Sequence, residues 1–302
     1  YRQFIDEMRI ANPHCKVIGL TATPFRTGTG DLCGPDSIFD EVCYEAPVKQ
    51  LIDEGFLCPL TTKPTDANAD LTNVPIRTGE YVQTEMQRAF MSDNLVERAC
   101  AEIVDKTNDR MSILIFTSGV DHCGAVAQKI RDLTGEEVED VVAGTRTLMR
   151  ASSLERFKNG TLRWLVNVGV LTTGFDAPNI DTVVVMRATQ SAGLFAQICG
   201  RGFRICANKD DCLVLDMGQN IERHGPLDDE DYGRRKKKSR EQAGPTKECL
   251  ECGKECPAGC AFCPHCGSAF PDPEANFDDK ADVGAAILQS QQKAIWYTVI
   301  PD

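Results

Sequence analysis

The sequence has no apolar run approaching the roughly 18 to 20 residues that a membrane-spanning helix needs, and its first residues do not have the pattern of a secretory signal. We therefore expect a cytoplasmic protein with no membrane partner. Positive charge is also scarce, because 33 lysines and arginines stand against 45 acidic residues, for a net charge of -12. Since phosphate binding draws mainly on Lys and Arg, this balance is unusual for a nucleic-acid-binding protein. Acidic residues gather outside the expected core, for example in residues 228–231 and 272–282, so the charge is unevenly distributed.

Cysteine is abundant, with 15 residues in a chain that shows no secretory signal, and this favours reduced thiols and metal ligation over disulfides. Four cysteines form two pairs with the spacing of a zinc ribbon, Cys249-x2-Cys252 and Cys263-x2-Cys266. Four thiolates in this arrangement can close a tetrahedron around one Zn²⁺. So short a segment cannot build a core, so the metal would supply its folding free energy, about 10 kcal/mol in small zinc fingers. The alternative is four incidental buried cysteines. Two others in the segment are expected to be spare thiols: Cys256 and Cys260.

The middle of the chain alternates apolar runs of strand length with amphipathic stretches of helix length. Helices are expected over 93–108, 121–133, 148–158 and 191–200, and strands over 113–116, 138–142, 164–168, 182–186 and 211–216. Strands that alternate with helices indicate an α/β fold with a parallel sheet and right-handed crossovers. Three apolar runs end in hydroxyl side chains, within Lys16–Arg26, Ser112–Ser118 and Val166–Pro178. Ligands of open α/β sheets bind at these strand ends.

Two arginines three residues apart are the most informative feature of the sequence, in the stretch from Gln197 to Arg204. Arg201 and Arg204 would share one face of a helix. Each guanidinium offers a planar fork of donors that can neutralise charge on a transferring phosphoryl group. The alternative is a pair of solvated arginines on a helix surface.

Taken in order, four segments resemble motifs of the superfamily 2 helicases: Thr21-Ala22-Thr23 (motif III), Ile115-Phe116-Thr117 (motif IV), Thr172 to Asp176 (motif V) and Gln197 to Arg204 (motif VI). The sequences of residues 19–30 and 174–181, together with the cysteine cluster that follows them, are most similar to the bacterial RadD group of DNA-repair helicases. The resemblance extends over roughly residues 1–270.

The resemblance implies that ATP and Mg²⁺ bind between two RecA-like lobes, each a parallel sheet with flanking helices. It implies three catalytic roles: Arg204 as an arginine finger, Arg201 as a second γ-phosphate contact, and Gln197 as the group that orients water or phosphate. It implies nucleotide binding or coupling by four residues: Gly174, Asp176, Thr21 and Thr23. It implies nucleic-acid contacts by two more: Thr117 and Thr172. The residues themselves leave simpler alternatives open, a turn or helix cap for Asp176 and a Thr-Pro turn for Thr21 and Thr23.

The domain boundaries follow from the motifs and the changes in pattern. A helix over 1–12 and a strand over 17–20 belong to the expected closing part of a first lobe, and a helix over 48–56 begins the connecting segment. The expected division is 1–44 (first RecA-like lobe), 45–92 (connecting segment), 93–223 (second RecA-like lobe), 224–247 (charged linker), 248–271 (zinc ribbon) and 272–302 (acidic tail, helix-forming around 285–293). The basic run Arg234–Arg240 fits a solvated linker and a phosphate contact equally well.

One departure from the family outweighs any match. The sequence contains neither the phosphate-binding loop G-x-x-x-x-G-K-[ST] nor the acidic box that holds magnesium. We therefore expect a fragment that cannot bind or hydrolyse Mg-ATP alone, from a parent ATP hydrolase that does both.

The expected function is that of the C-terminal portion of an ATP-dependent DNA helicase or translocase, with DNA and DNA-repair proteins as partners. Two alternatives remain open. The first is a nucleic-acid-binding accessory with a degenerate motor, and the second is a restriction-type translocation subunit.

Overall fold

The structure is a computed structural model, and it describes residues 2–23, 25–26, 30–33, 37–92, 94–229, 232, 246–248, 251, 255–257, 266 and 268–269. The described residues fall into two units, one that holds those up to 232 and one that holds those from 246 onward. No helix among them is long and apolar enough to cross a membrane. In the second unit, β11 (Thr246–Glu248) pairs antiparallel with β12 (Glu255–Pro257).

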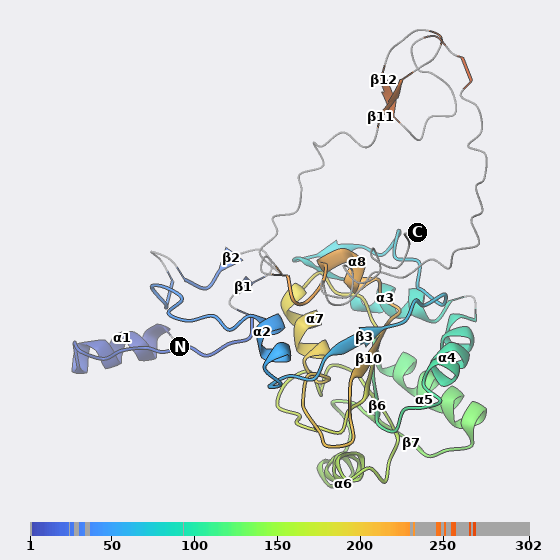
Figure 1. Cartoon of the computed structure of the whole chain (residues 1–302), viewed down its shortest axis with the longest axis horizontal. Coiled ribbons are helices and arrows are strands. Elements are labelled where there is room, and N and C mark those ends of the chain that lie inside the picture. The colour runs from blue at the N-terminus through green and yellow to red at the C-terminus, as the bar shows by residue number, and fades with distance from the viewer. Residues whose placement is uncertain are drawn as a thin grey trace, which may run out of the picture. The chain divides into compact units, whose positions relative to one another are not determined.

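A parallel sheet of six strands forms the centre of the first unit, in the order β3-β10-β9-β6-β8-β7 (Figure 1). The strands are β3 (Leu60–Thr62), β6 (Ile113–Thr117), β7 (Val138–Val141), β8 (Trp164–Asn167), β9 (Thr182–Met186) and β10 (Cys212–Asp216). Every residue of β6, β8, β9 and β10 is buried. Such continuous burial is typical of a parallel sheet covered by helices on both faces.

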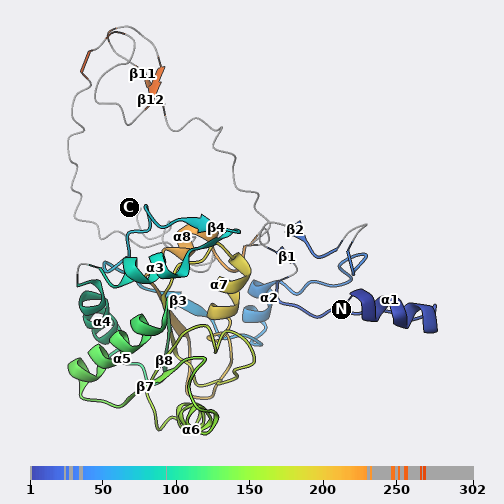
Figure 2. The ribbon, with the colours of Figure 1, turned by 180° about the vertical axis from the view of Figure 1, so that it is seen from behind.

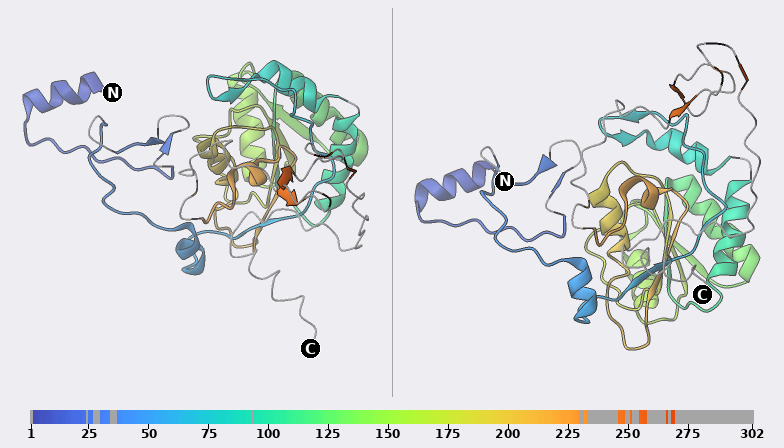
Figure 3. Two further views of the ribbon diagram at one scale, coloured as in Figure 1. Left: turned by 90° about the horizontal axis from the view of Figure 1, so that it is seen from above. Right: turned by 45° about the horizontal axis from the view of Figure 1, so that its top comes forward.

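Helices cover the two faces because alternate side chains of each strand point to opposite sides. Ile113 and Ile115 belong to the core beneath α3, α4 and α5, whereas Leu114 and Phe116 belong to the core beneath α6, α7 and α8. Figure 2 and Figure 3 show the sheet between these layers. The helices are α3 (Gln83–Phe90), α4 (Leu95–Lys106), α5 (Val120–Thr134), α6 (Thr147–Lys158), α7 (Ala192–Cys199) and α8 (Asn220–His224).

The expected elements of the second lobe are confirmed with small shifts of their ends, but the connecting segment differs from its prediction. Its helix α2 (Val48–Asp53) is present, yet residues 60–62 form β3, which pairs with β10 in the register Cys212↔Leu60. The segment also contains α3 and a hairpin of β4 (Ile76–Arg77) and β5 (Glu80–Tyr81). Leu60 is fully buried, so this segment is part of the core of the lobe.

The N-terminal segment has less structure than the sequence predicts. Helix α1 (Arg2–Ala11) is confirmed, and a short hairpin joins β1 (Phe25–Arg26) to β2 (Gly30–Asp31). The predicted strand over 17–20 is wrong, because Ile18 and Leu20 are 85% and 95% exposed and pair with no strand among the described residues. A β-strand needs neighbours for its hydrogen bonds, and the structure supplies none here.

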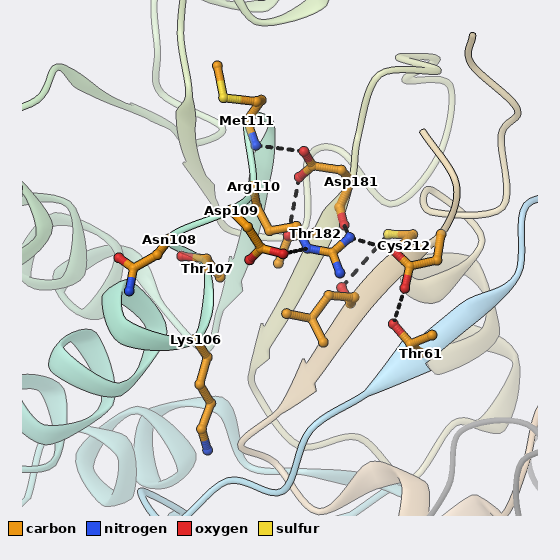
Figure 4. A network of polar contacts seen from close by, with 12 residues as sticks. Thr61, Lys106, Thr107, Asn108, Asp109, Arg110, Met111, Asp181, Thr182 and Cys212 are labelled. Atoms are coloured by element: carbon orange, nitrogen blue, oxygen red, sulfur yellow. Dashed lines mark hydrogen bonds and ion pairs between the residues drawn. The ribbon is translucent and has the colours of Figure 1, made fainter. Parts of the chain in front are cut away.

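A polar cluster fastens the amino ends of the strands (Figure 4). The Arg110 guanidinium is paired with the Asp211 carboxylate at 2.5 Å, and Thr61 Oγ1 donates to Asp211 at 2.9 Å. The Asp181 carboxylate accepts from the backbone amides of Met111 and Ser112 at 2.6 and 3.2 Å. Burial works against ionisation of Asp211, but the bonds from Arg110 and Thr61 hold its pKa below the usual value. The cluster thus ties β3, β6, β9 and β10 together at the edge opposite to the ligand-binding one.

The packing of one glycine generates a test of this fold. A Cβ at Gly202 would lie 2.5 Å from Cys212 Sγ and 3.2 Å from Leu60 Cδ2, so Gly202→Ala should lower the free energy of unfolding by about 1–3 kcal/mol. A matched control is Gly124→Ala, because Gly124 is exposed within α5 with no atom near its Cβ position. That variant should be neutral or more stable by about 0.5–1 kcal/mol. Urea unfolding measures both, and equal stabilities would contradict the packing.

Candidate functional site

The predicted site residues of the second lobe lie on loops that leave the carboxyl ends of the strands and on the turn after α7. The loop that follows β8 alternates between core and solvent. Phe175 and Ala177 are buried, whereas Thr173, Gly174 and Asp176 are exposed. The Phe175 ring packs against Phe157, with ring centroids 6.3 Å apart. Phe175 and Ala177 thus anchor the loop in the core, so that Asp176 between them faces solvent.

The arginines of the Gln197–Arg204 stretch do not lie on a helix, which corrects the sequence prediction. Helix α7 ends at Cys199, and the backbone continues as turns in which Arg201 N donates to Ile198 O at 3.2 Å. Glycines on both sides of Arg201 favour this early end, since glycine is a poor helix former. The two guanidiniums therefore do not share a helix face, and they are brought together by the loop opposite.

Arg201 is half-buried and bound to that loop. Its Nη1 donates to the carbonyl of Phe175, and its Nε lies 3.4 Å from the carbonyl of Gln197. Burial lowers the pKa of Arg201, the neighbouring charge of Arg204 lowers it further, and Asp176 opposes both. An arginine remains cationic under such shifts. The side chain is thus a fixed positive charge beside the exposed part of the loop.

Arg204 pairs with the same loop through its charge. Its Nε donates to Asp176 Oδ1 at 3.0 Å, with the two side chains 54% and 64% exposed. An exposed ion pair of this kind contributes little to stability. Asp176 is therefore a counter-ion that another anion can replace. The structure brings together three of the predicted site residues, Arg201, Arg204 and Asp176, and places Gln197 half-buried on the helix that precedes them.

The two residues predicted to contact nucleic acid, Thr117 and Thr172, form hydrogen bonds inside the lobe. Thr117 is fully buried and its hydroxyl donates to the carbonyl of Asn167 at 3.1 Å. Thr172 is also buried, and its hydroxyl donates to the carbonyl of Gly169 at 3.0 Å. Gly174 has a φ of +71° and open space around its Cβ position. The left-handed backbone explains the glycine, and the two hydroxyls shape the loop from within.

The Thr21 and Thr23 pair forms a local turn. The Thr21 hydroxyl accepts from Thr23 N at 3.0 Å and lies 3.2 Å from Thr23 O. A hydroxyl that binds the backbone two residues on is the mark of a Ser/Thr turn. The contacts of this segment support the turn alternative, and the coupling role stays a prediction.

His122, in the first turn of α5, is buried and contacts Ser118, the residue that follows β6. Its Nδ1 lies 2.7 Å from Ser118 Oγ, and the Phe90 ring stacks on it with centroids 5.4 Å apart. Burial lowers the pKa of His122 to about 3, so the ring is neutral. The contact fixes the backbone that leaves the central strand, and the sequence offered no partner for this histidine.

The predicted zinc ligands are almost all beyond the structural description. Cys249, Cys252 and Cys263 lie outside the described residues, while Cys266 is exposed with its Sγ 2.8 Å from Ser268 Oγ. No group of three metal-ligating side chains occurs in the part of the chain that is described. The basic run 234–240 and the acidic tail from 272 also lie outside it. These predictions stay untested.

Comparison with known proteins shows which protein family the second lobe resembles. Residues 94–206 match the family Helicase conserved C-terminal domain. The lobe fits a superfamily 2 helicase. The chain is 27% identical over 221 residues to IRC3 of Saccharomyces cerevisiae, whose name describes an ATP-dependent helicase, covering 72% of this chain and 32% of that protein. It is 29% identical over 229 residues to the endonuclease subunit of the Escherichia coli type I restriction enzyme EcoAI, covering 68% of this chain and 27% of that protein.

A solved structure shows the same fold. It is a fragment assigned to the HsdR subunit of a type I restriction enzyme from Vibrio vulnificus, with a TM-score of 0.50, 22% identity, and coverage of 65% of this chain and 38% of that one. The RecA-like helicase lobe expected from the sequence is thus supported, whereas the finer resemblance to the RadD group is not confirmed. The chain spans at most about a third of the length of the curated relatives named above, 32% and 27%.

The buried imidazole of His122 predicts a pH dependence of stability. Because the folded ring has a pKa of about 3 and an unfolded histidine one near 6.5, the unfolded state takes up the proton first as the pH falls. The free energy of unfolding should therefore fall below about pH 6.5, by up to about 1.4 kcal/mol per pH unit from this group.

Urea unfolding from pH 7 to pH 4 tests this dependence. His122→Asn keeps an acceptor near Ser118 and should be less stable at pH 7 but show a shallower decline toward pH 4. His14→Asn, at an exposed position, is the matched control and should keep the wild-type slope. A slope unchanged in His122→Asn would refute the assignment.

Proposed function

We propose that this chain is the C-terminal portion of an ATP-dependent DNA helicase or translocase of superfamily 2, acting in DNA repair or recombination. The observation that carries the proposal is the pairing of Arg201 and Arg204 with one loop, through the carbonyl of buried Phe175 and the carboxylate of exposed Asp176. One fixed cation, Arg201, and one more exposed cation, Arg204, beside a replaceable carboxylate are suited to meet a triphosphate. The helicase names of the relatives support the same function.

The arrangement suggests how the motor would work. Nucleotide bound to a phosphate-binding loop elsewhere in the parent protein would draw the Arg204 guanidinium from Asp176 to the γ-phosphate. Arg201, held by the Phe175 carbonyl, would keep a second positive charge in place. Bound ATP and Mg²⁺ supply the transferring phosphoryl group and the metal that neutralises its charge. Gln197 would then orient the attacking water.

Coupling to the nucleic acid would run through the same loop. Asp176, released from Arg204, lies two residues after Gly174, where the left-handed backbone lets a ligand approach closely. A change of charge at the nucleotide would therefore alter the interactions of the exposed part of the loop. The turn of Thr21 and Thr23 would contribute the matching contact from the first lobe.

A type I restriction translocation subunit is the second candidate, and the EcoAI relative is the observation that favours it. The same ATP-driven movement would then serve DNA cleavage. A nuclease domain in the complete protein and cleavage of long DNA would distinguish it from a repair helicase. A degenerate motor is the third candidate, and absence of DNA-stimulated ATP hydrolysis would identify it.

Arg204→Ala in the complete protein should lower the rate of DNA-stimulated ATP hydrolysis by about 10³ to 10⁵ and leave nucleotide binding largely intact. The reason is that a finger of this type acts on charge that develops in the transition state. Phosphate release and binding of a labelled ATP analogue measure the two effects. Arg88→Ala is the control, since Arg88 is 75% exposed on α3 and paired only with Glu85 among the described residues. Full activity of Arg204→Ala would eliminate the finger.

We also propose that the cysteine cluster binds one structural Zn²⁺ through Cys249, Cys252, Cys263 and Cys266, on the strength of the ligand spacing. Metal analysis should find one zinc per chain. The zinc should be lost in Cys249→Ser and retained in Cys256→Ser, because the second cysteine is spare. The opposite pattern would assign the site to the inner cysteines.

A further inference from the structure

Arg187 lies at the carboxyl edge of the parallel sheet, near the ends of three neighbouring strands. It is the first residue after β9, and β9 lies on one side of the central strand β6 while β8 lies on the other. A Cβ placed at Gly169, beyond the end of β8, would lie 3.9 Å from Arg187 Nη1. The guanidinium therefore reaches from the end of β9 past the end of β6 to the loop after β8.

This guanidinium has no hydrogen-bond or ion-pair partner among the residues that the structure describes. Its Nε is buried and unsatisfied. Burial lowers the pKa of Arg187, and only Glu80 opposes this. Glu80 is already engaged, since its carboxylate accepts from Thr189 Oγ1 at 2.5 Å and from Gln190 N at 2.9 Å. A buried donor without a partner is costly, so the position favours an anion that arrives from outside the chain.

The backbone around Arg187 is locked in place. Its carbonyl accepts from Asn220 Nδ2 at 2.9 Å, and Thr189 N donates to Asn220 Oδ1 at 2.9 Å. Asn220 is in turn held by Asp216, whose Oδ1 lies 2.8 Å away. A Cβ at Gly218 would overlap the Arg187 carbonyl oxygen, so the close approach there requires glycine. The backbone that carries the side chain is thus fixed, so ligand binding need not order it.

The same edge holds other unsatisfied polar atoms. Asn167 Oδ1, at the end of β8, and His122 Nε2, in the first turn of α5, are both buried without a partner among the described residues. The anion-binding character of this edge rests on the Arg187 cation, which is unpartnered within the described part of the chain and lies at the ends of parallel strands, where ligands bind.

We propose that Arg187 binds a phosphate of the nucleic-acid strand at the carboxyl edge of the lobe. Arg201 and Arg204 contact the far end of the loop, at Phe175 and Asp176, and are assigned to the nucleotide. The Arg187 guanidinium lies close to the near end of the loop, at Gly169, and so provides a separate positive site. A guanidinium matches the fork geometry of a phosphodiester. The inference rests on the proposed function, because it requires that the lobe meets nucleic acid.

The experiment measures the affinity of the complete protein for a labelled single-stranded oligonucleotide over a range of salt concentrations. Arg187→Gln should weaken binding about 10-fold or more at low salt and reduce the slope of log affinity against log salt by about 0.7, whatever the base sequence. Arg187→Lys should recover part of the affinity and the full slope, since the charge is kept. Arg88→Gln removes an equal charge from an exposed helix position and should change neither quantity.

Three results would overturn the inference, and each is distinguishable. Unchanged oligonucleotide binding by Arg187→Gln, with the wild type binding normally, refutes the contact alone. Loss of binding to an ATP analogue, with oligonucleotide binding intact, assigns Arg187 to the nucleotide. A wild type that binds no oligonucleotide refutes the proposed function together with the contact. Thermal unfolding separates binding from folding, because removal of an unpaired cation should leave the melting temperature of Arg187→Gln unchanged or higher.

Discussion

Burial on both faces is the constraint on which the rest of the lobe depends. The four central strands offer no polar surface along their length, so every group that could meet a ligand must lie where a strand begins or ends. The two edges are used differently. At the amino edge charged groups neutralise one another, as Arg110 does with Asp211. At the carboxyl edge charges are left exposed, weakly paired or unpaired.

The exposed loop after β8 links these edge charges. Phe175 and Ala177 hold it to the core, and Thr173, Gly174 and Asp176 face solvent. Both arginines of the α7 turn are bound to this one loop, by a carbonyl and by a carboxylate. A ligand that competes for either arginine therefore acts on the loop directly. The two arginines and the loop therefore form one connected group at this edge of the lobe.

Much of the second lobe could be predicted from local pattern, because its strands are continuous apolar runs and its helices are amphipathic. The residues of the α7 turn were found by their chemistry, although their helical placement was wrong, since two glycines end the helix first. Strand β3 could not be predicted, because three residues in a proline-rich stretch become a strand only by pairing with β10. Arg187 could not be found either, since the lack of a partner is a property of the folded chain.

The exposed pair of Arg204 and Asp176 has a consequence for selectivity among ligands. A weak, dilute anion must displace a carboxylate already seated at 3.0 Å, whereas a polyanion brings several charges at once and displaces it readily. Because an exposed ion pair contributes little free energy, the internal carboxylate gives only a modest preference for ligands that carry several negative charges. Its removal would make the guanidinium more accessible and less discriminating.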